Sequence, residues 1–193
     1  MQRVIIFNKP FRVLSQFTDR RTNSLPRTTL ANFIDIKDYR VAGRLDYNSE
    51  GLLILTNDGK LQNYITNPIK EIWKTYLVQV EGKITKQAVG NLRAGILLKD
   101  GITRAAKVSV ISDPKLWLRN PPIRVRKSIP VSWIRISIQE GRNRQIRRMT
   151  AAVGFPTLRL IRIGIGNLTL NALQPGEFLF RSMPSSVKMI NQK

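Results

Sequence analysis

Apolar residues fall along the chain in short runs that are separated by polar and glycine-containing stretches. Continuous or alternating apolar runs predict strands over residues 3–8, 41–45, 52–56, 74–80, 103–111, 131–138 and 157–168. Capping residues followed by apolar positions at helical spacing predict short helices over residues 29–34, 60–66 and 85–93. Strands and helices alternate without the regular rhythm of a doubly wound sheet. We therefore expect an α+β fold with a mixed, mostly antiparallel sheet and flanking helices.

Two polar stretches between these elements are predicted to be surface loops. Residues 20–29 are rich in Arg, Thr, Asn and Ser, and residues 113–130 contain four prolines and several arginines. Loops of the second length are uncommon in compact domains unless they have a function. Residues 185–193 are predicted to form a flexible tail.

The charge of the chain changes this picture most. Lys and Arg number 33 against 12 Asp and Glu, which gives a net charge of +21 and a pI near 11.4. Such an excess weakens a fold by self-repulsion, and it favours a polyanionic partner such as a nucleic acid. Residues 119–162 hold ten Arg and one Lys against the single acid Glu140. Arg clusters bind phosphate through bidentate hydrogen bonds, although such a run also fits a solvated helix face.

The absence of two residue types limits the chemistry. Without Cys there is no disulfide, thiolate nucleophile or thiolate metal site, and without His there is no Ser-His-Asp triad. Catalysis would have to use Asp, Glu, Tyr, Lys, Ser or backbone groups. The apolar run 4–7 is too short for a signal peptide and the run 52–55 is too short to span a bilayer, so we expect a cytoplasmic protein.

Three side chains outside the arginine cluster are candidates for chemistry. Asp46 follows the apolar run 41–45 and fits either a catalytic carboxylate or a structural turn aspartate. Tyr76 shares a strand face with Lys74 and Val78, where a core tyrosine is the ordinary interpretation. Glu50, four residues after Asp46, would permit a two-carboxylate glycosidase site.

The most basic segment predicts a helix that begins near Gly141. Ile146, Met149 and Val153 share one apolar face at a spacing of 3.6 residues. Arg144 and Arg148 project from the opposite face, and Arg147 lies at the border between core and solvent.

Several segments in order along the chain together resemble the RsuA-type ribosomal RNA pseudouridine synthases. Gly43–Asp46, Ser49–Leu53 and Thr56–Gly59 resemble the central motif of that family. The segments that resemble its other motifs are Phe7–Pro10, Lys74–Tyr76 and Glu140–Met149. The likeness extends from about residue 3 to residue 181.

The resemblance is sharper for a large-subunit subgroup of the family. This chain has Ser49 where many members have Thr, and it contains the run Arg119–Arg124. The sequence starts at the segment that resembles the first catalytic strand, so we expect no S4 domain. The resemblance implies one pseudouridine synthase domain over residues 1–184, with two sublobes, a catalytic cleft between them and no separate RNA-binding domain.

The resemblance also implies a mechanism and its residues. Asp46 would be the carboxylate that acts at the ribose of a uridine in 23S ribosomal RNA, and Tyr76 would stack on the flipped base. Arg147 would pair with Asp46 and keep it ionised. No cofactor or metal would be needed, because the reaction is an isomerisation. Further RNA contacts are expected from Lys9, Arg44, Arg124, Arg126, Lys127, Arg142, Arg144 and Arg148.

Two other classes of protein share some of these features. A non-catalytic RNA-binding or ribosomal protein would carry the same charge, but it would have no use for the combination of Asp46, Tyr76 and Arg147. An RNA glycosidase could use the same carboxylate, but it would release free uracil. Because a chain this basic repels its own copies, we expect a monomer.

Overall fold

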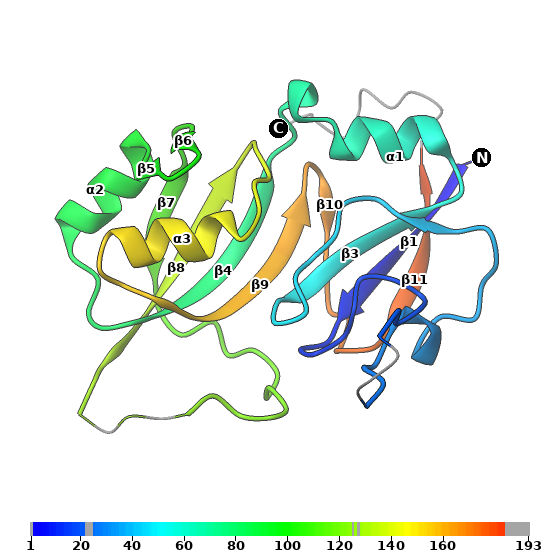
Figure 1. Ribbon diagram of the computed structural model, residues 1–193, viewed down its shortest axis with the longest axis horizontal. Helices are drawn as coiled ribbons and strands as arrows, with labels where there is room; N and C mark the ends of the chain where they lie inside the picture. The colour runs from blue at the N-terminus through cyan, green and yellow to red at the C-terminus, as the bar shows by residue number, and fades with distance from the viewer. Residues whose placement is uncertain (1, 22–24, 125, 127, 184–193) are drawn as a thin grey trace. The chain divides into compact units, whose positions relative to one another are not determined.

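The computed structural model describes residues 2–21, 25–124, 126 and 128–183 of the 193-residue chain. The chain forms two compact units (Figure 1). The first comprises residues 1–72 and 162–193, and the second comprises residues 73–161. Strand β9 (Thr157–Ile165) begins in the second unit and ends in the first.

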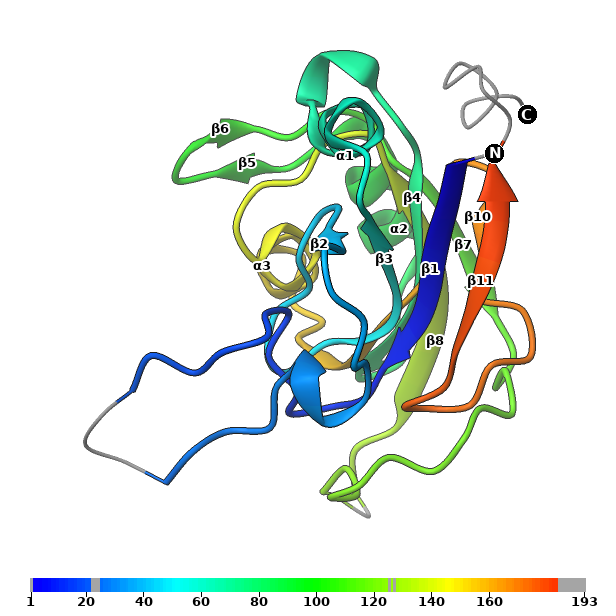
Figure 2. The same cartoon turned by 90° about the vertical axis from the view of Figure 1, so that its right-hand side faces the viewer.

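The first unit is built around its N-terminal strand. Strand β1 (Gln2–Lys9) lies between β3 (Glu50–Thr56) and β11 (Phe178–Met183) and pairs with both in antiparallel fashion (Figure 2). Two short strands extend this arrangement, β2 (Arg40–Val41) on β3 and β10 (Leu168–Thr169) on β9. Every residue of β3 is buried, which is the pattern of a strand covered on both faces.

Helix α1 (Gly59–Thr66) follows β3 and has a clear start signal. The Asp58 carboxylate accepts hydrogen bonds from the backbone N–H groups of Lys60 and Leu61, at 2.7 and 3.2 Å. Leu61 and Ile65 are one turn apart and both buried. A 3-10 turn at Leu30–Asn32 is capped by Thr29, and a second one follows α1 at Pro68–Lys70.

The second unit places helices on one face of an antiparallel set of strands. The strand order is β9, β4 (Lys74–Glu81), β8 (Val131–Ile138) and β7 (Lys107–Ile111). Helices α2 (Lys86–Ala94) and α3 (Gln145–Ala152) lie in front of these strands in Figure 1.

The two faces of β4 therefore have different surroundings. Val78 and Val80 are fully buried, and so are Ile134 and Ile136 on the neighbouring strand β8. These even-numbered positions form the face that the helices cover. The odd-numbered positions of β4, which include Gln79 and Glu81, face the other way. A small separate hairpin, β5 (Leu97–Leu98) and β6 (Gly101–Ile102), completes the unit.

The α+β fold with a mostly antiparallel sheet is confirmed, and the predicted helices 60–66 and 85–93 and most strands are present. The predicted helix 29–34 is only a three-residue 3-10 turn, and the helix predicted to begin near Gly141 begins at Gln145. The predicted strand 41–45 was too long, because only Arg40–Val41 pairs with β3. The predicted strand 103–111 was wrong before residue 107, and the strand 157–168 is interrupted by a turn after Ile165. The hairpin β5–β6 and strand β11 were not predicted. The predicted tail 185–193 lies outside the described residues.

None of the helices in the described part of the chain is long and apolar enough to cross a membrane.

Candidate active site

The segment that carries Asp46 is an irregular loop of the first unit, held at several points along its backbone. Ala42 N–H donates to Ile54 O at 2.8 Å, and Arg12 N–H donates to Tyr47 O at 2.9 Å. The Ser49 N–H closes a turn by donating to Asp46 O at 3.0 Å. This turn agrees with the sequence prediction. The loop thus has a defined path although it belongs to no strand.

Two buried side chains fix the loop more tightly. Ser15 Oγ donates to Leu45 O at 2.8 Å and accepts from Leu45 N–H at 3.1 Å. Arg162 donates from Nε to Leu52 O at 2.8 Å and from Nη2 to Gly43 O at 3.0 Å. Each side chain thereby replaces the strand pairing that the sequence predicted for this part of the backbone. Ser15 acts on the residue immediately before Asp46.

The burial of Lys9 contradicts the prediction that its side chain contacts RNA. Its side chain is fully buried, and Nζ donates to Pro10 O and Val13 O, both at 2.8 Å. The amino group in this position is hydrogen-bonded to the chain after β1 and is not presented to an external phosphate. Burial lowers the pKa of Lys9 from 10.5 to about 7, although the charges of Glu50 and Asp46 raise it.

This burial predicts a pH dependence of stability. Between pH 7 and pH 10.5 the unfolded chain binds a proton at Lys9 that the folded chain has largely lost. The unfolding free energy therefore rises with pH in this window, by at most about 1.4 kcal/mol per unit. Urea unfolding of wild type and Lys9→Met at pH 7.5 and 9.5 should show wild type gaining about 2 kcal/mol relative to the variant. Lys83→Met, at an exposed lysine, should follow the wild-type pH dependence; equal pH dependence of Lys9→Met and wild type would contradict the assignment.

Glu50, the candidate second carboxylate, is buried. It is the first residue of β3, it is 2% exposed, and its charge acts on Lys9. A carboxylate in this position has little access to a substrate, which disfavours a two-carboxylate glycosidase site. No group of three or more acidic side chains forms a metal site in the described part of the chain.

Tyr76 and Arg147 belong to the second unit. Tyr76 lies in β4 opposite Ile136 and is 8% exposed, on the helix-covered face. Arg147 lies in α3 and is half-buried, next to the buried Ile146. Both positions agree with the strand and helix predicted for them. Asp46 and Arg44 come from the first unit, where Asp46 is half-buried and Arg44 is exposed.

Two arginines that were predicted to bind RNA have partners inside the protein. Arg142 donates to the carbonyls of Asp100, Gly101 and Ile102 at 3.2, 2.9 and 2.6 Å, and also to Glu140. Arg148 forms a two-pronged ion pair with Asp100 at 2.8 and 3.0 Å, which holds the pKa of that carboxyl below its usual range.

These contacts make Arg142 and Arg148 anchors of the β5–β6 hairpin. A guanidinium with several acceptors inside the protein has fewer donors left for phosphate. The contacts therefore do not support the prediction that Arg142 and Arg148 bind the RNA backbone. Arg144 precedes α3 in a left-handed conformation and is exposed. Among these three arginines, Arg144 has the position that agrees with the predicted RNA contact.

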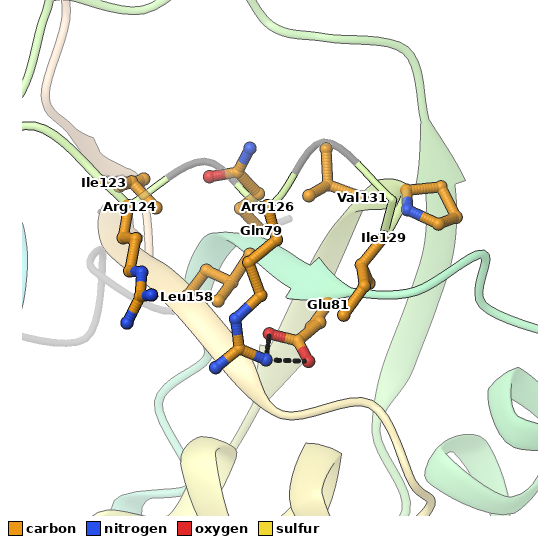
Figure 3. A pocket seen from close by; sticks show the side chains of 9 residues that line it. Gln79, Glu81, Ile123, Arg124, Arg126, Ile129, Val131 and Leu158 are labelled. Carbon is orange, nitrogen blue, oxygen red and sulfur yellow. Dashed lines mark hydrogen bonds and ion pairs between the residues drawn. The ribbon is translucent and has the colours of Figure 1, made fainter.

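The segment between β7 and β8 carries the remaining predicted RNA contacts. Arg124 and Arg126 are exposed, and Lys127 lies outside the described residues. Trp117 anchors this segment by its contact with Arg159, whose guanidinium carbon lies 5.6 Å from the ring centre. Arg126 reaches back to Glu81 at the end of β4 (Figure 3).

Sequence reasoning missed Ser15 and Arg162 as parts of this site. A signal was present only for Arg162, which lies between two isoleucines of β9 and is 3% exposed. A charged residue in such a run indicates a buried donor with specific acceptors. Ser15 gives no comparable signal, because its partner Leu45 is 30 residues away.

Comparison with known proteins identifies the class of this fold. The chain matches the family model described as RNA pseudouridylate synthase over residues 3–152. It therefore belongs to the RNA pseudouridylate synthase family, whose members are isomerases. This confirms the resemblance that the motifs around Asp46, Tyr76 and Arg147 indicated.

Individual relatives narrow the comparison. A protein of Vibrio vulnificus (strain CMCP6), named ribosomal large subunit pseudouridine synthase E, is 55% identical over 184 residues, covering 95% of this chain and 77% of the relative. A protein of Xanthomonas axonopodis pv. citri with the same name is 52% identical, covering 89% of this chain and 90% of the relative. Ribosomal large subunit pseudouridine synthase B of Bacillus subtilis is 39% identical over 135 residues, covering 70% of this chain and 50% of the relative.

Solved structures share the fold. A crystal structure of a pseudouridylate synthase has a TM-score of 0.79 at 27% identity and covers 98% of this chain and 74% of its own. An H/ACA ribonucleoprotein bound to a substrate RNA has a TM-score of 0.58 at 13% identity, over 86% of this chain and 48% of that one. The second likeness concerns the fold alone.

Proposed function

We propose that this enzyme converts a specific uridine of the large-subunit 23S ribosomal RNA into pseudouridine. The observation that carries the proposal is the 52–55% identity, over most of the chain, to relatives named for that activity. The net charge of +21 supports a polyanionic substrate of this kind.

The proposed reaction moves one glycosidic bond and leaves the oxidation state unchanged. The bond from C1′ of the ribose to N1 of uracil breaks, the base turns, and a bond from C1′ to C5 forms. The C5 proton is lost and N1 gains a proton, so atoms and electrons balance without a cofactor. We assign the carboxylate of Asp46 to the step at the ribose, either as nucleophile at C1′ or as base at C2′.

Tyr76 and Arg147 are proposed to support this step. The ring of Tyr76 would stack on the flipped uracil and relay the C5 proton. Arg147 would pair with Asp46 and keep it ionised, because a guanidinium opposes the rise in pKa that a dry pocket causes. This set of groups accounts for an active enzyme without His or Cys.

Arg44 is proposed to assist base flipping. It is exposed and stands two residues before Asp46, so its side chain can fill the space that the base leaves or hold a neighbouring phosphate. Arg44→Ala should lower kcat/KM on a duplex-embedded uridine at least about 10-fold more than on a loose single strand, since only the duplex pays for unpairing. Tritium release from both substrates measures this, and an equal loss on both would contradict the role.

The central experiment uses ribosomal RNA labelled with tritium at uridine C5. Wild type should release tritium from 23S RNA, or from an assembling particle, without producing free uracil. Free uracil would indicate a glycosidase, which the burial of Glu50 disfavours because it gives the second carboxylate little access to a substrate. Tight salt-sensitive binding without tritium release from naked RNA or from particles would favour a non-catalytic RNA-binding protein.

We further propose that the enzyme acts as a monomer in the cytoplasm. Self-repulsion at a net charge of +21 supports the monomer. Sedimentation of the free protein as a species near 22.1 kDa would check it.

A further inference from the structure

A pocket of about 300 Å³ opens in the second unit, beside the end of β4 (Figure 3). Gln79 and Glu81 of β4 line it, and in an unbroken strand these odd-numbered positions face away from Tyr76. The remaining lining residues come from β8, β9 and the segment between β7 and β8: Ile123, Arg124, Arg126, Ile129, Pro130, Val131 and Leu158. The pocket is therefore separate from the face that carries Tyr76.

A fixed guanidinium forms one wall of the pocket. Arg126 Nη1 donates to both carboxylate oxygens of Glu81, at 3.0 and 3.3 Å. The side chain of Arg126 is nevertheless 52% exposed, so the plane of its guanidinium remains accessible. Ile129, Val131 and Leu158 give the rest of the pocket an apolar surface. Unstacked bases bind to such surfaces by stacking on guanidinium planes and apolar groups.

Polar groups in the pocket suit the edge and the backbone of a nucleotide. The Oε1 atom of Gln79 is buried and accepts no hydrogen bond from the residues that the structure describes. A side-chain amide offers both donors and acceptors, which match the edge of a nucleobase. Arg124 also lines the pocket and is exposed, as a phosphate contact requires. The volume is at the lower end of the roughly 300–1,000 Å³ range of ligand pockets, which suits one base.

We propose that this pocket binds one unstacked nucleotide of the substrate RNA, away from the uridine that is modified. The base stacks on Arg126, which Glu81 holds in position, and its edge meets the amide of Gln79. Arg124 binds the adjoining phosphate. The inference rests on the proposed action on ribosomal RNA and adds a second point of RNA recognition to it. Such a contact raises affinity for a folded substrate that presents the nucleotide at the correct place.

The test compares variants of the full chain on a 23S ribosomal RNA fragment. Arg126→Lys keeps the positive charge but removes the planar guanidinium on which the base is proposed to stack. Arg124→Ala removes the proposed phosphate contact. Each should raise the Kd for RNA and the KM for tritium release about 5- to 10-fold, the low end for loss of one stacked base. Arg135→Lys and Arg135→Ala are matched controls, because Arg135 is exposed on the same face of β8 and does not line the pocket. Both controls should change Kd less than twofold.

Photocrosslinking of RNA that contains 4-thiouridine locates the contact directly. Wild type should yield a nucleotide adduct on the peptide that spans Ile129–Val131, and Arg126→Lys should weaken it. The pocket inference is overturned if Arg126→Lys and Arg124→Ala bind RNA as the Arg135 variants do. It is also overturned if they weaken binding to an assembling particle but not to naked RNA, because the occupant would then be a protein. The binding measurement does not depend on catalysis. If the wild type binds RNA through the pocket but releases no tritium, the proposed function is refuted and the pocket inference stands.

Discussion

Asp46→Asn is expected to abolish tritium release from C5-labelled ribosomal RNA while leaving RNA binding intact. Asparagine has nearly the same shape as aspartate, so the turn that Ser49 closes on the Asp46 carbonyl remains possible. The amide cannot act as nucleophile or base, and turnover should fall by at least about 10³-fold. The Kd for RNA should stay within about twofold, because phosphate contacts by other arginines dominate affinity. Single-turnover kinetics with saturating enzyme and a filter-binding titration measure the two quantities.

Asp35→Asn provides the matched control for this result. It removes one carboxylate from an exposed position of the same unit and should retain full activity. Asp46→Glu adds a sharper comparison, since it restores the charge and displaces it by one methylene group; its turnover should remain low. Turnover by Asp46→Asn at the wild-type rate would show that Asp46 has no catalytic role, and would favour the interpretation of Asp46 as a structural turn aspartate.

The sequence predicts those parts of the fold that depend on local patterns. Runs with a clear period or a capping residue gave β1, β3, β4, β8 and helices α1 and α2 at nearly their observed bounds. Strand β11 escaped prediction because its six residues, three apolar ones followed by Arg181, Ser182 and Met183, show no regular alternation of apolar and polar types. It is a strand because β1 pairs with it, about 175 residues away in the sequence. Such a partner is invisible to a local pattern.

The arginine cluster shows why charge alone does not assign a binding surface. Residues 140–149 are the most basic part of the chain, yet Arg142 and Arg148 are committed to a hairpin that begins more than 40 residues earlier. The hairpin β5–β6 has strands of two residues each, too short to leave an alternating pattern. Without the hairpin, its carbonyls and Asp100 could not be foreseen as partners. The motif therefore predicted that a helix lies here but placed its start about four residues too early, and it did not show that Arg142 and Arg148 have partners inside the protein.

The burial of ionisable side chains was also not predictable from the sequence. Lys9 closes an apolar run, and a lysine at a strand end is ordinarily exposed. Here residues 4–9 of β1 are all buried, so the side-chain amino group of Lys9 must find carbonyl partners. Together with Glu50 and Arg162, Lys9 gives the first unit an interior with ionisable groups close to Asp46. The motif located Asp46, whereas the groups that surround it became known only from the structure.

Ser15→Ala is expected to slow turnover although Ser15 touches no substrate in the proposed mechanism. Its hydroxyl holds both the N–H and the carbonyl of Leu45, and Asp46 is the next residue. Removal of the hydroxyl leaves two backbone groups in a buried site without that partner and frees the loop to shift. A displacement of about 1 Å at a reacting group can cost about 10²-fold in rate. We therefore expect kcat to fall about 10- to 100-fold and KM to change less than about threefold.

Ser132→Ala separates this positioning role from a general loss of stability. Ser132 Oγ makes the same pair of contacts in the second unit, donating to Gly82 O at 2.8 Å and accepting from Ile84 N–H at 2.9 Å. Both variants should lose about 1–3 kcal/mol of unfolding free energy, since each removes one hydroxyl from two backbone partners. Only Ser15→Ala should lower kcat, because only Ser15 adjoins the loop of Asp46. If the two variants lose stability alike and both keep wild-type turnover, the Leu45 contacts stabilise the fold without positioning the carboxylate.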